Sequence, residues 1–306
     1  MKLLRKKNPK RAKSKILNTF IRFSLSSFII GSFFYIVPIF ISFADKNFNN
    51  KEFTNNSKNI LNKTLNKDKI FEEGDTWSKS DEVDLLYDIL EENNSEINLV
   101  RYTTSEINAL FREVKYDLEE VRDTKLVKPI DIGLLPNEIK NIANTKKRKE
   151  MFIKIVLPLI VKENNKIRID RKRLFGILSK NSNTNIEKKW LEKKYRQYGV
   201  RKNDLSTLKI RMDEIPISLA IAQAAKETGW GTSRFALKGN ALFGQWTWSG
   251  EGLKPKNAQE GEEHKVMKFH SLQLSVRAYL RNLNTHSSYK NLRKARTDLR
   301  NKDKPL

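Results

Sequence analysis

The sequence predicts a mainly α-helical protein of the α+β class, preceded by an N-terminal transmembrane helix. Apolar residues recur at helical spacing over most of the chain after residue 80. Residues 264–269 alternate between polar and apolar side chains, which is typical of a short strand. A long uncharged apolar stretch near the N-terminus is typical of a membrane-spanning helix. We therefore expect a helical protein with one small β-region.

The N-terminus combines a basic flank with this apolar stretch. Residues 1–22 carry nine Lys or Arg and no acid, and residues 23–44 carry no charge. Such a stretch is long enough to cross a bilayer, and its basic flank favours a cytoplasmic position for residues 1–22. We expect a single-pass anchor in the inner (cytoplasmic) membrane, with the catalytic part on the periplasmic or extracellular side. A signal peptide cleaved after Ala44 is the alternative.

The part that follows divides by composition. Residues 45–80 are rich in Asn, Lys and Ser and lack apolar periodicity, as in a flexible linker. Residues 81–180 form an expected helical N-terminal region. Apolar residues at helical spacing predict helices at 82–92, 105–121 and 147–177. Pro158 is expected to kink or split the last of these helices.

Further helices are expected at 185–198, 204–212 and 271–283. Residues 290–304 are strongly basic and are expected to form an exposed tail.

Charge and residue usage limit the possible partners and cofactors. The formal net charge is +24, so polyanions and anionic surfaces are favoured partners. The absence of Cys excludes disulfides, thiolate catalysis and Cys-based zinc sites, and the three His lack close pairing. We expect no metal, no cofactor and a monomer. The basic residues are scattered, so specific nucleic-acid binding is not expected, and it is kept only as a weaker alternative.

The candidate site lies in residues 216–248. Pro216 is suited to the start of a helix and Gly229 to its end. Glu227 then lies in the last turn, next to a loop rich in aromatic residues. Apolar surroundings favour the protonated form of a carboxylic acid, which suits a general acid, although a solvated Glu is the alternative. Five apolar residues are predicted to share the buried helix face: Ile217, Ala220, Ile221, Ala224 and Ala225.

Three segments resemble a known family. AQAAKETGWG at 222–231 resembles the motif around the catalytic Glu of glycoside hydrolase family 73, the peptidoglycan-cleaving glucosaminidases with a lysozyme-like fold. GNALFGQW at 239–246 resembles the family's Asn-Leu-Phe-Gly motif, and residues 275–293 are similar to its Bax-type bacterial proteins. The resemblance implies a lysozyme-like helical lobe with a small β-lobe, and a glucosaminidase-like catalytic domain over residues 181–306.

The resemblance also implies roles for single residues. Glu227 corresponds to the general acid, and Tyr289 matches a Tyr near the family's site, although a packed helix-end Tyr is equally consistent with its spacing. Glycoside hydrolysis usually needs a second carboxylate across the cleft. Glu260 is the best match, and the alternatives are Glu251, Glu262 and Glu263.

Substrate-binding residues are expected in the aromatic loop. Trp230, Phe243 and Trp246 can stack on sugar rings, although aromatic side chains more often fill cores. Asn240 and Gln245 can hydrogen-bond an N-acetylhexosamine, and Asn240 is alternatively a turn residue.

The expected function is an endo-β-N-acetylglucosaminidase that acts on peptidoglycan glycan strands, without amidase activity. A muramidase or lytic transglycosylase on the same scaffold is one alternative, and a non-catalytic wall-binding protein is another. Inversion, retention and participation by the substrate's acetamido group all stay open, because the choice depends on the separation of the two carboxyl groups.

Overall fold

The computed structural model describes residues 89, 91, 99–247, 252–255 and 265–306. All of them lie in the unit Leu65–Leu306. The predicted anchor and linker lie outside these residues, as does most of the predicted helix at 82–92. Within the described ranges, no helix combines the length and the apolar character needed to cross a bilayer.

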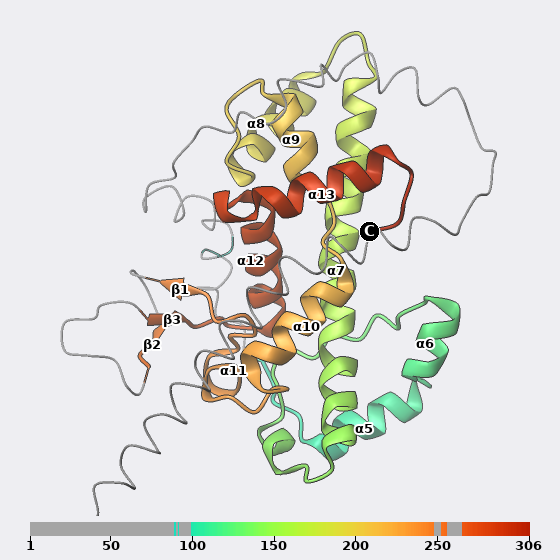
Figure 1. Ribbon diagram of the computed structural model, residues 1–306, viewed down its shortest axis with the longest axis vertical. Coiled ribbons are helices and arrows are strands. Elements are labelled where there is room, and N and C mark those ends of the chain that lie inside the picture. Colours follow the sequence, from blue (N-terminus) through green and yellow to red (C-terminus); the bar gives the residue numbers. More distant parts are fainter. Residues whose placement is uncertain (1–88, 90, 92–98, 248–251, 256–264) are drawn as a thin grey trace, which may run out of the picture. The chain divides into compact units, whose positions relative to one another are not determined.

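Helix α7 (Thr145–Leu178) is the element against which α10 and α12 pack (Figure 1). Its first turn is capped by Asn144, whose side chain accepts a hydrogen bond from the Lys147 amide at 3.0 Å. The helix passes through Pro158 without being divided, so the expected split is wrong. A proline costs an interior helix about 3 kcal/mol. Burial of a single large apolar side chain contributes about 1.5–3 kcal/mol, and an almost unbroken buried run on both sides of Pro158 outweighs the cost.

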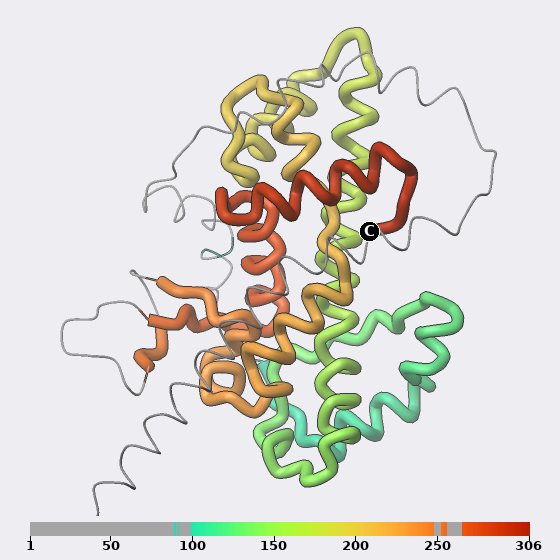
Figure 2. The backbone as a smooth tube through the Cα atoms, viewed as in Figure 1, coloured from blue at the N-terminus to red at the C-terminus, as the bar shows by residue number. Residues whose placement is uncertain are grey.

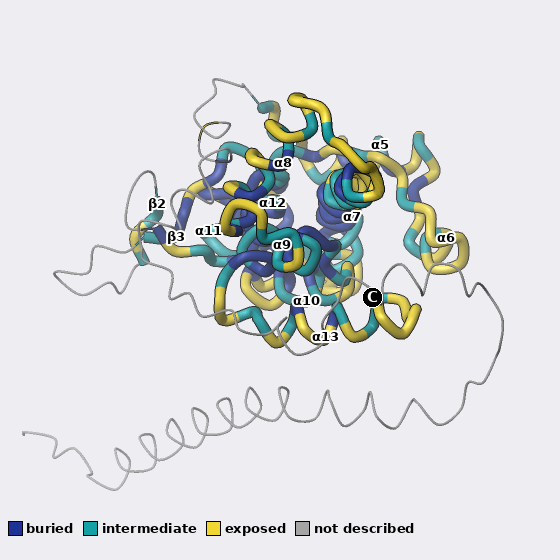
Figure 3. The backbone as a smooth tube through the Cα atoms, turned by 90° about the horizontal axis from the view of Figure 1, so that it is seen from above, coloured by how far each residue is buried: buried dark blue, intermediate teal, exposed yellow. Residues whose placement is uncertain are grey.

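Two short helices replace the single helix expected before α7. Helix α5 (Thr104–Glu113) begins with a capping box at Thr103, and α6 (Leu118–Thr124) begins at Asp117, whose side chain accepts two backbone N–H groups. Lys115 between them has a φ of 51°, a left-handed conformation that interrupts the helix. Helix α6 has no buried residue, which Figure 3 shows as a largely yellow and teal segment. A short 3₁₀ helix, η1 (Asn137–Asn141), precedes α7.

Helices α8 (Asn185–Gln197) and α9 (Leu205–Arg211) lie where the sequence predicts them. Thr184 and Asp204 cap their N-termini. Their apolar sides form a separate cluster with the end of α7, which includes Leu174, Ile177, Leu191, Tyr195, Leu208 and Met212.

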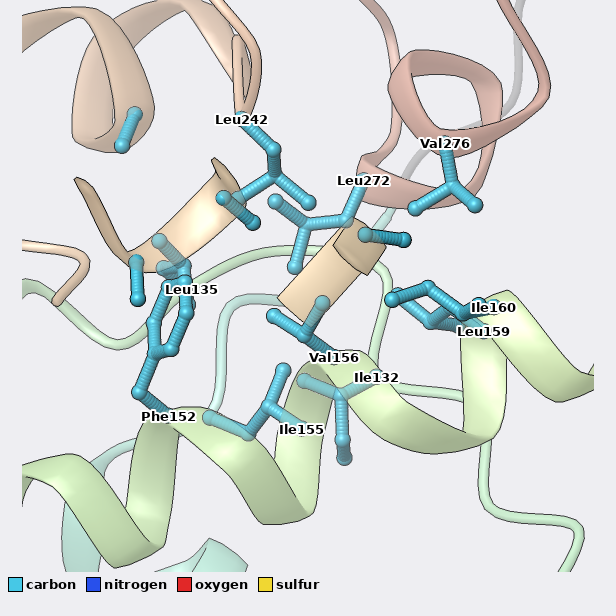
Figure 4. Packing of buried hydrophobic residues seen from close by; sticks show 14 of the residues in the cluster. Ile132, Leu135, Phe152, Ile155, Val156, Leu159, Ile160, Leu242, Leu272 and Val276 are labelled. Atoms are coloured by element: carbon cyan, nitrogen blue, oxygen red, sulfur yellow. The ribbon is translucent and has the colours of Figure 1, made fainter. Parts of the chain in front are cut away.

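The main core lies where α10 (Ile217–Thr228) and α12 (Leu272–Thr285) meet α7. Figure 4 shows side chains of α7 facing Leu272 and Val276 of α12 across this core. Asn164 of α7 fixes the start of α10, because its side chain bonds both the N–H and the C=O of Ile215, at 3.0 and 2.7 Å. The start of α10 is therefore fixed to α7.

A three-stranded antiparallel sheet follows helix α11 (Arg234–Gly239) and confirms the α+β prediction. Its strands are β1 (Trp246–Thr247), β2 (Gly252–Leu253) and β3 (Lys265–Met267), in the order β1-β3-β2. Trp246 pairs with Val266, and Gly252 pairs with Met267. The strand predicted at 264–269 is β3, whereas α11 was not predicted.

The predicted basic tail is wrong, because its residues form helix α13 (Lys290–Asn301). Figure 2 follows the chain from α12 through the 3₁₀ turn η2 (Ser287–Tyr289) into α13. Arg293 and Arg296 are only 1% and 2% exposed. Arg296 donates hydrogen bonds to backbone carbonyls from Ile210 to Glu214 and lies near Asp213. Hydrogen bonds to carbonyls allow these guanidinium groups to be buried where free charges would stay in water.

Candidate active site

The end of helix α10 presents Glu227. The helix begins after Pro216 and ends at Gly229, which has φ 58° and ψ 43° and returns its N–H to the Ala225 carbonyl, as predicted. The buried face differs in part from the prediction: Ala220, Ala224 and Ala225 are buried, whereas Ile217 is 39% exposed and Ile221 is half-buried. Ile217 and Ile221 lie at the edge of the apolar stripe, so the core covers only its centre.

The Glu227 side chain is exposed with respect to the described residues. The described residues therefore do not form the apolar surroundings that were expected around the Glu227 carboxyl group. Trp248, Glu251, Glu260, Glu262 and Glu263 lie outside the described residues, so the predicted second carboxylate stays a prediction.

Gly244 lies against the Glu227 carboxylate. The position that a Cβ atom would take at Gly244 is 3.6 Å from Oε2 of Glu227. The φ of Gly244 is 60°, a conformation in which residues with a side chain are strained. A glycine here lets the loop before β1 come close to the acid.

Two tyrosines in the C-terminal part of the chain interact electrostatically with Glu227. Burial raises the pKa of Tyr279, and the nearby Tyr289 and Glu227 raise it further. Burial likewise raises the pKa of Tyr289, and the charge of Glu227 adds to this effect. Both phenols are therefore neutral at pH 7 and can donate hydrogen bonds.

Tyr279 is fixed by two contacts. Its ring stacks on Phe243 with the centroids 3.8 Å apart and the planes 2° from parallel. Its hydroxyl donates a hydrogen bond to Oε1 of Gln223, one helical turn before Glu227. The sequence prediction missed Gln223 and used Tyr279 only as an apolar residue of its helix. The i, i+4 spacing between Gln223 and Glu227 places both on one helix face and was an available signal.

Tyr289 ends η2, and a buried arginine supports this turn. Nη1 of Arg293 donates to the carbonyls of Leu283 and His286, at 3.2 and 2.7 Å. The Tyr289 ring meets the His286 ring edge-on, with 6.1 Å between centroids. The role of Tyr289 near the acid, which the sequence resemblance implies, stays a prediction.

The predicted sugar-binding residues lie in different environments. Trp230 is half-buried against α7, where its ring meets Phe152 edge-on at 6.0 Å and Lys149 lies 4.8 Å from its centroid. Phe243 is buried against Tyr279. Trp246 is 47% exposed on the edge strand β1. Of these three rings, Trp246 presents the largest exposed fraction to a ligand.

The two predicted amide residues also differ. Asn240 is 6% exposed, has a φ of 50°, and donates through Nδ2 to the carbonyls of Phe269 and His270, at 2.8 and 3.1 Å. This is the turn role that was weighed as its alternative, and it occupies both amide hydrogens. The side-chain oxygen of Gln245 is buried and has no hydrogen-bond partner among the described residues. No group of three or more acids or His among these residues is placed to hold a metal ion.

The comparisons with known proteins cover this part of the chain. Residues 203–304 match the family model described as "Glucosaminidase: Mannosyl-glycoprotein endo-beta-N-acetylglucosaminidase". The matched residues make up about a third of the chain. The matched region extends from α9 to α13 and includes Glu227, Tyr279 and Tyr289, whereas α7 lies outside it.

The chain is also similar to "Protein bax" of Escherichia coli (strain K12), with 34% identity over 165 residues. The aligned part makes up 52% of this chain and 59% of that protein. The chain thus spans less than two thirds of the length of this curated relative. No solved structure matches the chain.

Proposed function

We propose that the protein is a peptidoglycan hydrolase, an endo-β-N-acetylglucosaminidase that cleaves β-1,4 glycosidic bonds at N-acetylglucosamine. Glu227 acts as the general acid and protonates the leaving oxygen. Glu260, or another acid among Glu251, Glu262 and Glu263, supplies the second carboxylate. Residues 23–44 anchor the chain in the cytoplasmic membrane, and the domain works on the outer side.

One observation carries the proposal: Glu227 lies against Gly244, and its charge acts on Tyr279 and Tyr289, within the part of the chain that matches the glucosaminidase family model. An exposed acid on a rigid helix end can reach a bound glycan. A neutral phenol at Tyr289 can donate a hydrogen bond to the sugar or to the water that completes hydrolysis. Trp246 offers a stacking surface on the edge of the sheet.

The glycan polymer is inferred from the sequence. The family description names a mannosyl glycoprotein. The motifs around Glu227 and Phe243 resemble the peptidoglycan-cleaving family, and the net charge of +24 favours anionic wall polymers over a neutral glycan. A glycoprotein glycan and peptidoglycan both contain N-acetylglucosaminide bonds. The two alternatives therefore differ in the polymer that is cleaved.

The test is a digestion of peptidoglycan sacculi by the purified full chain, followed by reduction of the products and analysis of their reducing ends. Reduced N-acetylglucosamine is the expected end. Reduced N-acetylmuramic acid would instead indicate a muramidase, and an anhydro end would indicate a lytic transglycosylase. A high-mannose glycoprotein, digested in parallel, is expected to stay intact.

Glu227→Gln is expected to remove the activity, because the amide cannot deliver the proton. The matched control is Asp298→Asn, which neutralises an exposed acid of the same domain on α13 and is expected to keep full activity. Intact sacculi with the wild-type chain, or equal activity of Glu227→Gln, would refute the proposal. Binding to sacculi without product release would favour a wall-binding protein.

A further inference from the structure

A cavity lies between α7, α8 and α12, and Glu227 is not among its lining residues. Its volume is about 420 Å³, within the range of about 300–1,000 Å³ that is usual for small-molecule sites. On α12 it is lined by Arg277, Arg281 and Asn284, which follow one helix face. Tyr279 lies about 200° around the helix from Arg277, so the cavity and the candidate active site use opposite faces of α12.

The cavity is lined mainly by charged side chains. Four are basic and two are acidic, an excess of two positive charges: Lys166, Lys194, Arg277 and Arg281 against Glu163 and Asp170. Ligand sites are more often apolar, so this lining favours a polar ligand.

The two acids are already engaged with basic groups. Glu163 is 3% exposed, and its carboxylate accepts hydrogen bonds from Lys166 Nζ at 2.8 Å and from Arg277 Nε at 3.1 Å. Burial raises the pKa of Glu163, but Arg277, Lys166 and Gln273 lower it by more, so the carboxylate is ionised at neutral pH. Asp170 pairs with Lys194 Nζ at 2.5 Å. The acids thus orient Arg277 and Lys194, and the net charge of the lining stays positive.

Arg281 adds to this positive field. Its guanidinium carbon lies 5.7 Å from the ring centroid of Tyr198, which is buried at the cavity wall. Burial lowers the pKa of Lys194, Asp170 raises it, and the charge of Arg281 lowers it again. Arg281 and Lys194 thus both contribute positive charge to the lining of the cavity.

We propose that this cavity is a binding site for a small polar anion that carries a carboxylate or a phosphate group, held by Arg281 and Lys166. Planar guanidinium groups bind both kinds of group through paired N–H donors. Glu163 and Asp170 can accept N–H or O–H groups from the rest of the ligand. The inference does not depend on the glycosidase activity, because no residue of the Glu227 site is involved.

Calorimetric titration of the full chain with three probes, at constant ionic strength, tests the proposal. The probes are inorganic phosphate, succinate and the uncharged analogue succinamide. We expect saturable binding of phosphate, succinate or both, and none of succinamide. Phosphate alone would identify a phosphate ligand, and succinate alone a carboxylate ligand.

Three variants connect binding to the cavity. Arg281→Gln and Lys166→Gln are each expected to weaken binding about tenfold, the size of one lost charged hydrogen bond. Lys172→Gln removes an exposed charge elsewhere on α7 and is expected to leave binding unchanged. Lys166 is half-exposed, and Glu163 keeps Arg277 as a partner, so Lys166→Gln gives a valid result even if Arg281→Gln misfolds.

Absence of saturable binding by both anions would overturn the proposal. Equal binding of succinamide, or equal weakening by Lys172→Gln, would also overturn it, since either result would indicate non-specific attraction to a basic protein.

Discussion

The hydroxyl of Tyr279 donates a hydrogen bond to the side-chain oxygen of Gln223, and this bond connects α12 to the end of α10. Tyr279→Phe keeps the ring that stacks on Phe243 but removes the donor. We expect the free energy of unfolding to fall by about 1 kcal/mol, the usual net contribution of one hydrogen bond. Turnover of peptidoglycan should also fall, because the Glu227 helix end loses its tie to α12. Urea denaturation and muropeptide release measure the two effects.

Tyr116→Phe is the matched control for this change. The Tyr116 hydroxyl is buried and has no hydrogen-bond partner among the described residues. Its removal should leave stability unchanged or raise it, because a buried unsatisfied polar group is lost. Equal destabilisation by both substitutions would show that the bond to Gln223 contributes nothing specific.

Gly244→Ala is expected to impair activity more than stability. Because the φ of residue 244 is 60°, a side chain there should lower the free energy of unfolding by about 1–2 kcal/mol. The new methyl group would lie 3.6 Å from Glu227 Oε2. The measurements are kcat on sacculi and the denaturation midpoint. Gly176→Ala within α7 is the control, because its Cβ meets no atom within 4 Å and should stabilise the helix by about 0.5–1 kcal/mol. Unchanged kcat in Gly244→Ala would contradict the close approach.

Asp213 makes the stability of the domain dependent on acid pH. Burial raises its pKa, but the hydrogen bond from Arg300 and the charges of Arg171 and Arg296 lower it by more, to below its ordinary value. Because the pKa of Asp213 is lower in the folded than in the unfolded protein, its ionised form stabilises the fold. This stabilisation is complete above the pKa of the unfolded state, near 4, and is lost as the pH falls through the pKa of the folded state. Urea denaturation between pH 7 and pH 2 should show this loss below about pH 4.

Asp213→Asn should remove that dependence and cost about 3–5 kcal/mol at pH 7, because the buried Arg296 keeps its carbonyl acceptors but loses the carboxylate that balances its charge. Asp298→Asn neutralises an exposed acid of α13 and should change neither the stability nor its pH profile. If the free energy of unfolding of Asp213→Asn still fell below pH 4 as steeply as that of the wild type, other carboxylates would be responsible for the effect.

Arg293 is expected to act as a positioning residue for Tyr289. Arg293→Met would leave the carbonyls of Leu283 and His286 without a buried donor, at a cost of about 1–3 kcal/mol. If the turn at η2 sets the place of Tyr289, kcat falls while KM changes little. Lys294→Met changes an exposed neighbour on the same helix and should preserve both constants. Loss of stability with unchanged kcat would limit Arg293 to a structural role.

The sequence alone predicted the elements whose limits are set by neighbouring residues in the chain. Pro216 and Gly229 predicted both ends of α10, and the alternating residues around Val266 predicted β3. The break at Lys115 was missed because a left-handed Lys within a helical apolar pattern has no local signature.

Tertiary contacts explain most of the remaining differences. Pro158 suggested a divided helix, but packing on both sides keeps α7 whole. The basic composition of α13 suggested an exposed tail, whereas Arg293 and Arg296 are buried through hydrogen bonds to distant carbonyls. The bond between Tyr279 and Gln223 joins residues 56 positions apart, which no local pattern reveals. Glu227 and Tyr289 were singled out by resemblance to known motifs, whereas the bond between Tyr279 and Gln223 emerges from the fold.

The position of α7 outside the matched region has a practical consequence for anyone who wishes to dissect this protein. A fragment cut at residues 203 and 304 would lose the helix that covers the inner sides of α10 and α12. Ala220, Ala224, Leu272 and Val276 would then meet water, and the isolated piece should self-associate or precipitate rather than behave as an autonomous module. The smallest soluble fragment is expected to begin before residue 145, well upstream of the boundary that sequence similarity marks.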